Sequence, residues 1–247
     1  MLLVNVAHGL LALYLLTLLA VPKVQTPLVA LTCLLARGHL LIEDLPGMGK
    51  TTLSHALARV LGLSFQRIQF TSDLLPGDIL GTSVFDKDSG QFAFHPGPIF
   101  AELVLADEIN RAPAKTQAAL LEVMQERQVT LEGRALAVPK PFMVMATQNP
   151  IEQEGTYPLP EAELDRFMLK LRMDYPQLDE ELNMVRQVTR SARADMLEVS
   201  PLRTLLQVKD VLALQKIASD LPLDDQVLDY AVRLARATRS WPGLAMG

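Results

Sequence analysis

A short glycine-containing loop between an apolar run and a helical pattern constrains this sequence more than any other feature. The apolar run covers residues 39–42, and a helix is predicted from about Lys50 to Leu61. Between them stands Asp44-Leu45-Pro46-Gly47-Met48-Gly49-Lys50-Thr51, which fits the second half of the phosphate-loop pattern GxxxxGK[ST], with Asp44 in place of the first glycine. The strand, loop and helix are the context that this pattern requires, so we expect an α/β fold with a phosphate site at the loop.

Each position of the loop suits one part of a magnesium–nucleotide complex. Gly47 and Gly49 allow backbone N–H groups to approach phosphate oxygens, and Lys50 supplies a fixed positive charge. The Thr51 hydroxyl is an oxygen ligand of the kind that Mg²⁺ prefers. A Gly/Pro turn that happens to precede Lys-Thr is the alternative. We predict nucleotide binding by Pro46, Gly47, Met48, Gly49, Lys50, Thr51 and Thr52.

A second motif combines four apolar residues, Leu103 to Ala106, with the acids Asp107 and Glu108. Such a run predicts a central strand with both carboxylates at its C-terminal end, which is where doubly wound sheets bind ligands. Asp107 is expected to hold Mg²⁺, and Glu108 to act as the general base on the attacking water. A solvated strand end is the alternative for an isolated run, but the phosphate loop earlier in the chain favours the catalytic interpretation.

Two further polar residues are candidates for the same site. Asn149 follows the apolar strand predicted over residues 142–146, and its amide would orient the attacking water if that strand neighbours the one ending in Asp107. Without that adjacency, Asn149 is a turn residue before proline. Arg166 ends a helical segment that begins at Glu161. It is either a surface arginine in an ion pair or a residue that reaches the γ-phosphate of a neighbouring subunit.

The pattern of elements divides the chain into an α/β part and a helical part. Strands that alternate with helices up to residue 175 predict a parallel sheet covered on both faces, and the helices that follow predict a small all-α domain over 176–247. The predicted strands and hairpins are 64–70, 82–94, 129–138 and 142–146, and the predicted helices are 25–36, 113–127, 178–193, 208–219 and 224–239.

Charge and cysteine content narrow the function classes. A formal net charge of −5 leaves no overall basic field for a nucleic acid partner. The single Cys33 forms no internal disulfide, which favours a reducing, cytoplasmic compartment. Residues 1–24 are atypical, because the first 22 carry no charged side chain and approach the length of a membrane span. A buried helix and an atypical start of the chain are the alternatives.

These motifs together resemble the MoxR group of AAA+ ATPases over about residues 25–247. Besides the phosphate loop, the resemblance rests on residues 94–98, on 106–113 (ADEINRAP), on 146–160 (ATQNPIEQEGTYPLP) and on 164–167 (LDRF). It implies a P-loop AAA+ core over 25–175 that hydrolyses ATP with Mg²⁺, followed by a helical lid. It also implies that Lys50 binds ATP, that Asp107 and Glu108 are the Walker B pair, that Asn149 is the first sensor and that Arg166 is the arginine finger.

The same resemblance implies partners. MoxR proteins assemble as homo-oligomers, typically hexameric rings, and remodel or activate client proteins, often with a von Willebrand factor A domain partner. The hairpins at about 82–94 and 129–138 match insertions that contact clients. The chain ends at Gly247, where relatives continue into a segment with a second sensor arginine, so an incomplete lid is expected. The alternative to an ATP-driven chaperone is therefore a nucleotide-binding interaction module with little turnover. A nucleic acid remodeller would need basic hairpin tips, and these tips are neutral or acidic.

Overall fold

The computed structural model describes residues 25–43, 49–87, 90–131, 133–149, 155–172, 182, 186 and 202–241. The apolar segment 1–24, the loop residues Pro46, Gly47 and Met48, and most of the predicted helix 178–193 lie outside this set. The expectations for them, including contact of residues 1–22 with a membrane, stay predictions. Within the described ranges, each helix is too short or too polar to cross a bilayer.

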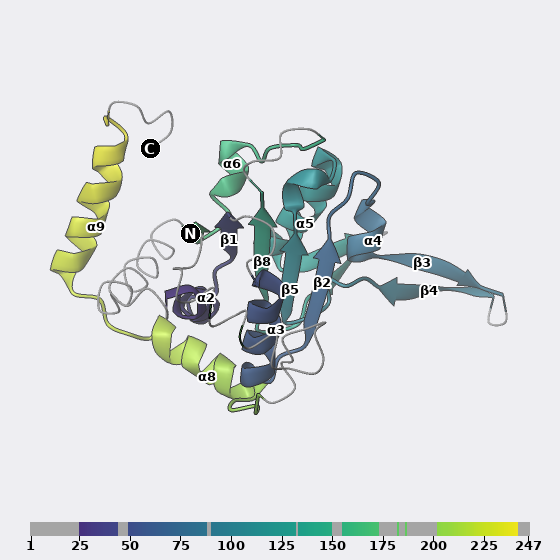
Figure 1. Cartoon of the computed structure of the whole chain (residues 1–247), viewed down its shortest axis with the longest axis horizontal. Helices are drawn as coiled ribbons and strands as arrows, with labels where there is room; N and C mark the ends of the chain where they lie inside the picture. Colours follow the sequence, from purple (N-terminus) through teal and green to yellow (C-terminus); the bar gives the residue numbers. More distant parts are fainter. Residues whose placement is uncertain are drawn as a thin grey trace.

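Five parallel strands form the central sheet, in the order β2-β5-β8-β1-β9 (Figure 1). Each of β5 and β8 is buried almost throughout, as is typical of parallel strands with helices on both faces. The chain therefore has the predicted P-loop α/β architecture, with helices following at its C-terminal end. The strands are β1 (Leu40–Glu43), β2 (Phe65–Gln69), β5 (Leu103–Asp107), β8 (Met143–Gln148) and β9 (Leu169–Arg172).

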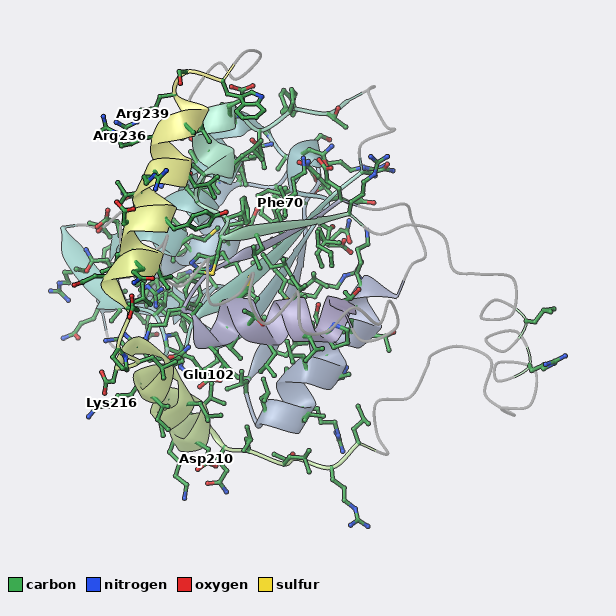
Figure 2. The ribbon with its side chains drawn as sticks, turned by 90° about the vertical axis from the view of Figure 1, so that its left-hand side faces the viewer. Phe70, Glu102, Asp210, Lys216, Arg236 and Arg239 are labelled. Carbon is green, nitrogen blue, oxygen red and sulfur yellow. The ribbon has the colours of Figure 1, made fainter. Side chains whose placement is uncertain are left out.

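Alternate residues of the strands supply two hydrophobic cores, one on each face of the sheet. Leu103 and Leu105 of β5 pack with apolar residues of α2 (Gln25–Leu35), α3 (Lys50–Leu61) and α8 (Val208–Ser219). Val104 and Ala106 pack on the opposite side with α4 (Pro76–Leu80) and α5 (Ala114–Glu126). Phe70, directly after β2, is fully buried in this second core (Figure 2). Helices thus cover both faces of the sheet, and the candidate site lies at the carboxyl ends of the strands.

Two hairpins lie outside the central sheet. The longer one pairs β3 (Gly81–Asp86) with β4 (Gln91–Pro96) and extends away from the α/β core (Figure 1). Its base is anchored by an edge-to-face contact between Phe94 and Phe100, whereas Phe85 and Phe92 form a second aromatic pair that is exposed to solvent. The shorter hairpin pairs β6 (Gln128–Leu131) with β7 (Arg134–Ala137). Both hairpins were predicted from the sequence.

Two helices whose bounds the structure describes follow the core. The helix α8 has the predicted bounds and docks on α2, where Val211 is buried and the Gln215 side chain donates to the backbone oxygen of Leu34 at 2.6 Å. The helix α9 (Asp225–Thr238) begins at Asp224, whose carboxylate caps it through the N–H of Gln226. Figure 1 shows α9 apart from the α/β core, and Figure 2 labels Arg236 and Arg239 near its C-terminal end. A domain boundary at residue 176 stays a prediction.

Besides the three-residue 3-10 helix η2 (Ile109–Arg111), two described elements have no counterpart among the predicted ones. The strand β9 is an edge strand of four residues, Leu-Lys-Leu-Arg, and so short an alternating run carries little signal by itself. Its position is set by pairing with β1, in which Leu40 lies opposite Leu169. The five-residue helix α4 begins at Pro76, and it is held to α5 by the Thr116 hydroxyl, which donates to the oxygen of Leu74. Tertiary contacts define both elements.

One buried histidine ties the sheet to α5. Nδ1 of His39 accepts a hydrogen bond from the N–H of Val144 at 2.9 Å, so Nε2 carries the proton and donates to the oxygen of Met124 at 3.2 Å. Burial, with a smaller contribution from the nearby charge of Arg127, lowers the pKa of His39 to about 4. The ring is therefore neutral at pH 7 and acts as a structural hydrogen-bonding group.

Acidification should destabilise the fold through His39. An unfolded chain takes up a proton at this histidine near pH 6.5, whereas the folded chain does so near pH 4, so the free energy of unfolding falls as the pH drops through this window. The expected loss is about 3 kcal/mol, from roughly 1.4 kcal/mol per pKa unit. Urea titrations at pH 7 and pH 4 measure it. His39→Gln should show a smaller loss than the parent, and His95→Gln, at an exposed position, the full loss; equal losses in all three would contradict the assignment.

Candidate functional site

The carboxyl ends of β5 and β8 bring the predicted acids and Thr147 together. The two strands are adjacent and parallel, with Ala106 opposite Ala146, so the residues that follow these alanines share one edge of the sheet. The buried hydroxyl of Thr147 donates to Oδ1 of Asp107 at 2.7 Å and accepts the backbone N–H of Glu108 at 2.9 Å. One hydroxyl group therefore fixes both acids relative to β8.

Glu108 leaves the strand with an unusual backbone. Its φ of 58° lies in the left-handed region, which non-glycine residues seldom adopt, and the 3-10 helix η2 (Ile109–Arg111) begins directly after it. The side chain is held from two sides, because Gln69 Nε2 donates to Glu108 Oε2 at 2.8 Å and Arg111 Nε lies 3.3 Å from the same oxygen. The carboxylate is thus aimed by the backbone and stabilised by two donors.

Asp107 is paired with an arginine from the neighbouring strand. Arg67 of β2 donates to Asp107 Oδ2 through Nη2 at 2.6 Å and through Nε at 3.1 Å. Gln69, two residues along the same strand, lies directly opposite Asp107 in the register, and its Oε1 accepts a hydrogen bond from Arg67 Nη2. The acids of β5 are therefore held by polar residues of both neighbouring strands, β2 and β8.

The N-terminus of α3 supplies the described half of the phosphate site. Gly49 is the N-cap residue with φ 80°, and no side chain caps the helix there. Lys50, Thr51 and Thr52 form its first turn, so their backbone N–H groups lie where a helix favours an anion. Because β1 pairs with β8, α3 begins at the same edge of the sheet as Asp107 (Figure 1). The donor set, a carboxylate and a threonine hydroxyl beside a helix N-terminus, fits Mg²⁺ with a phosphate.

Asn149 lies at this edge, one residue beyond the end of β8. The residue is buried, and its backbone oxygen accepts a hydrogen bond from Asn110 Nδ2 at 3.3 Å. Asn110 belongs to η2, which directly follows Glu108, and its own backbone oxygen accepts the N–H of Tyr157 at 2.6 Å. These bonds tie Asn149 to the segment that carries the acids. The adjacency on which its predicted role depends is present.

Arg166 lies away from the acids within one chain. It follows the short helix α6 (Glu161–Leu164), and its Nη1 donates to the backbone oxygen of Leu121 at 3.2 Å and to the side chain of Gln125, both on α5. Its Nε lies 4.0 Å from Glu163 Oε2. The ion-pair alternative thus has a partner one turn earlier. None of these contacts is with Asp107 or Glu108.

Sequence reasoning missed the residues that hold the acids, namely Arg67, Gln69 and Thr147. Arg67 and Gln69 are separated by one residue on the strand predicted over 64–70, so a period of two places their side chains on one face. That alternation is the signal that could have found them. It does not reveal which strand they adjoin, however, because the strand order comes from the tertiary fold.

Removing the Thr147 hydroxyl should destabilise the fold, because two hydrogen bonds each lose a partner. Thr147→Val keeps the shape but leaves Asp107 Oδ1 without this donor and the Glu108 N–H without its acceptor. The expected cost is about 1–3 kcal/mol of unfolding free energy, measured by urea titration. Thr130→Val on the exposed face of β6 is the matched control and should change stability by less than about 0.5 kcal/mol. Equal effects of the two variants would refute the proposed anchoring.

Comparison with known proteins places the whole arrangement in a family. The family model described as "ATPase family associated with various cellular activities (AAA)" matches residues 39–169, which contain four of the five strands of the sheet and the first residue of β9. A crystal structure of a proposed ATPase from Cytophaga hutchinsonii superposes with a TM-score of 0.76 at 41% identity, over 85% of this chain and 62% of that one.

Curated relatives agree with this match. Chaperone MoxR1 of Mycobacterium tuberculosis is 47% identical over 215 residues, which are 86% of this chain and 55% of MoxR1. Protein YeaC of Bacillus subtilis is 46% identical over 227 residues, which are 92% of this chain and 69% of YeaC. Protein MoxR of Paracoccus denitrificans is 37% identical over 152 residues. The chain thus spans only part of the length of these relatives. It belongs to the ATPase family associated with various cellular activities, and within it to the MoxR-type AAA+ ATPases.

Proposed function

We propose that this chain binds ATP with Mg²⁺ and hydrolyses the β–γ phosphoanhydride bond. The proposal rests on one observation: Asp107, Glu108 and the N-terminus of α3 all lie at the carboxyl ends of the parallel strands. The backbone N–H groups and Lys50 bind the phosphates, while Thr51 and Asp107 hold the metal. Mg²⁺ neutralises charge on the phosphate oxygens.

Glu108 is the proposed general base. Water attacks the γ-phosphorus, its proton passes to the Glu108 carboxylate, and the bond to the bridging oxygen breaks to give ADP and phosphate. Asn149 orients the attacking water from the end of the adjacent strand. Arg166 completes the site of a neighbouring subunit, where its guanidinium stabilises the charge that develops on the phosphoryl group.

The oligomer, clients and partner belong to the same proposal. We infer a homo-oligomer, with a hexameric ring as the expected form, that acts as a chaperone on client proteins together with a von Willebrand factor A domain partner. The relatives named MoxR and chaperone MoxR1 support this assignment. The exposed Phe85 and Phe92 of the β3–β4 hairpin supply an apolar contact surface for unfolded protein.

One observation favours the second candidate, a nucleotide-binding interaction module with little turnover. Glu108 Oε2 accepts a hydrogen bond from Gln69 Nε2 and lies 3.3 Å from Arg111 Nε, so these groups occupy lone pairs that a base would offer to water. Both candidates bind ATP. They differ in whether phosphate is released.

Phosphate release from ATP, measured with and without Mg²⁺ at several protein concentrations, separates them. Glu108→Gln and Arg166→Ala should each lower kcat at least about 100-fold, since one removes the base and the other a charge on the transition state. Glu126→Gln and Arg233→Ala, at exposed positions on helices, are matched controls that should retain parental activity. If the parent binds ATP but releases no phosphate at any concentration, the interaction module takes the place of the hydrolase.

Mixing the two inactive variants tests whether Arg166 acts between subunits. A mixed oligomer contains sites in which an Arg166→Ala subunit supplies Glu108 and its Glu108→Gln neighbour supplies Arg166. Such sites should recover part of the parental phosphate release, whereas each variant alone stays inactive. A mixture that stays inactive, although the two variants co-assemble by size-exclusion chromatography, would show that Arg166 does not act across the interface.

Client contact is tested at the hairpin tip. The double variant Phe85→Ser/Phe92→Ser should bind reduced, carboxymethylated α-lactalbumin at least several-fold more weakly than the parent in a pull-down, because the exposed aromatic pair is lost. Leu228→Ser, which replaces an exposed leucine of α9, is the control for a general loss of surface hydrophobicity. Equal binding by all three proteins would exclude the hairpin as the contact surface.

A further inference from the structure

The ion pair between Arg67 and Asp107 joins a buried carboxylate to a partly exposed guanidinium. Both Nε and Nη2 of Arg67 donate to a single oxygen, Oδ2, of a carboxylate whose side chain is 10% exposed. The Arg67 side chain itself is 45% exposed. The acid is therefore fixed in the protein, while its cationic partner lies at the solvent boundary.

A buried carboxylate needs a compensating charge when the nucleotide site is empty. Burying an unpaired charge is costly, and a partner that can donate two hydrogen bonds offsets much of that cost. Thr147 supplies a neutral donor to Oδ1, and Arg67 supplies the positive charge to Oδ2. The pair therefore stabilises the nucleotide-free chain and holds the Asp107 side chain in place.

The same carboxylate is the one that we assign to the metal, so the next step rests on the proposed function. A carboxylate has about four lone-pair directions, and Arg67 and Thr147 occupy three of them. A guanidinium at Oδ2 also repels a second cation that approaches the same group. The exposed half of Arg67 gives it a path into solvent.

We propose that Arg67 is a positioning residue for Asp107, a counter-cation that neutralises this carboxylate in the empty site and is displaced when Mg²⁺ and nucleotide bind. Its charge competes with the metal for Asp107. Arg67 therefore sets the Mg²⁺ concentration that nucleotide binding requires, and it prevents an unpaired charge from destabilising the chain between nucleotides. A residue that served only to pack β2 on β5 would have no effect on the Mg²⁺ requirement.

Binding of a fluorescent ADP analogue, titrated with Mg²⁺, tests the proposal without any need for turnover. The variants are Arg67→Met, which removes the charge, and Arg67→Lys, which retains it; Arg233→Met on the exposed face of α9 is the control. Arg67→Met should lower the half-saturating Mg²⁺ concentration roughly tenfold, because the competing cation is gone. Arg67→Lys should stay close to the parent. The thermal unfolding midpoint in EDTA should fall in Arg67→Met and recover when Mg²⁺ and ADP are added.

The Asp107→Asn background separates competition at this carboxylate from any general effect of the substitution. There, Arg67→Met should leave both the Mg²⁺ requirement and the unfolding midpoint unchanged, because asparagine carries no charge to compensate. An unchanged or increased half-saturating Mg²⁺ concentration in Arg67→Met overturns the inference while leaving nucleotide binding intact. If the parent chain binds no ADP analogue at any Mg²⁺ concentration, the proposed function fails, and the inference fails with it.

Discussion

The pairing of β5 with β8 is the constraint on which the site depends. It sets Ala106 opposite Ala146, and so places Asp107 beside Thr147 at the carboxyl edge of the sheet. A slip by one residue would exchange the side chains that face the two apolar cores on either side of β5, so the packing of both cores opposes it. Burial of aliphatic side chains therefore fixes the positions of the acids.

Several polar groups inside the fold are satisfied by residues that each make two or three hydrogen bonds. The Thr147 hydroxyl serves one acid and the backbone of the other, and the His39 ring joins β8 to α5 in its neutral form. Gln117 likewise donates to three backbone oxygens, those of Ile109, Ala112 and Tyr157, and so holds the segment after Glu108 in place. Each such group links elements far apart in the sequence, so its loss would loosen the site as well as the core.

Much of the fold followed from local pattern, because buried parallel strands are continuous apolar runs and the loops after them carry the polar residues. The run that ends in Asp107 predicted both the strand and the end of the sheet at which we propose that nucleotide binds. The edge strand β9 and the helix α4 could not be predicted in this way, since pairing and packing define them. Arg67 escaped notice for the same reason: a polar residue on a strand does not reveal its neighbour until the strand order is known.

Glu108 has a left-handed backbone conformation that lowers stability, whereas its carboxylate supplies the proposed activity. Activity and stability therefore place opposing demands on this one position. Glycine would adopt this conformation without the steric cost that any side chain carries, about 1 kcal/mol or more, yet glycine has no carboxylate. Selection for stability alone would favour glycine at this position, whereas selection for the proposed activation of water would retain the strained glutamate. Under the proposed mechanism, the identity of residue 108 in a relative indicates whether that relative can activate water in the same way.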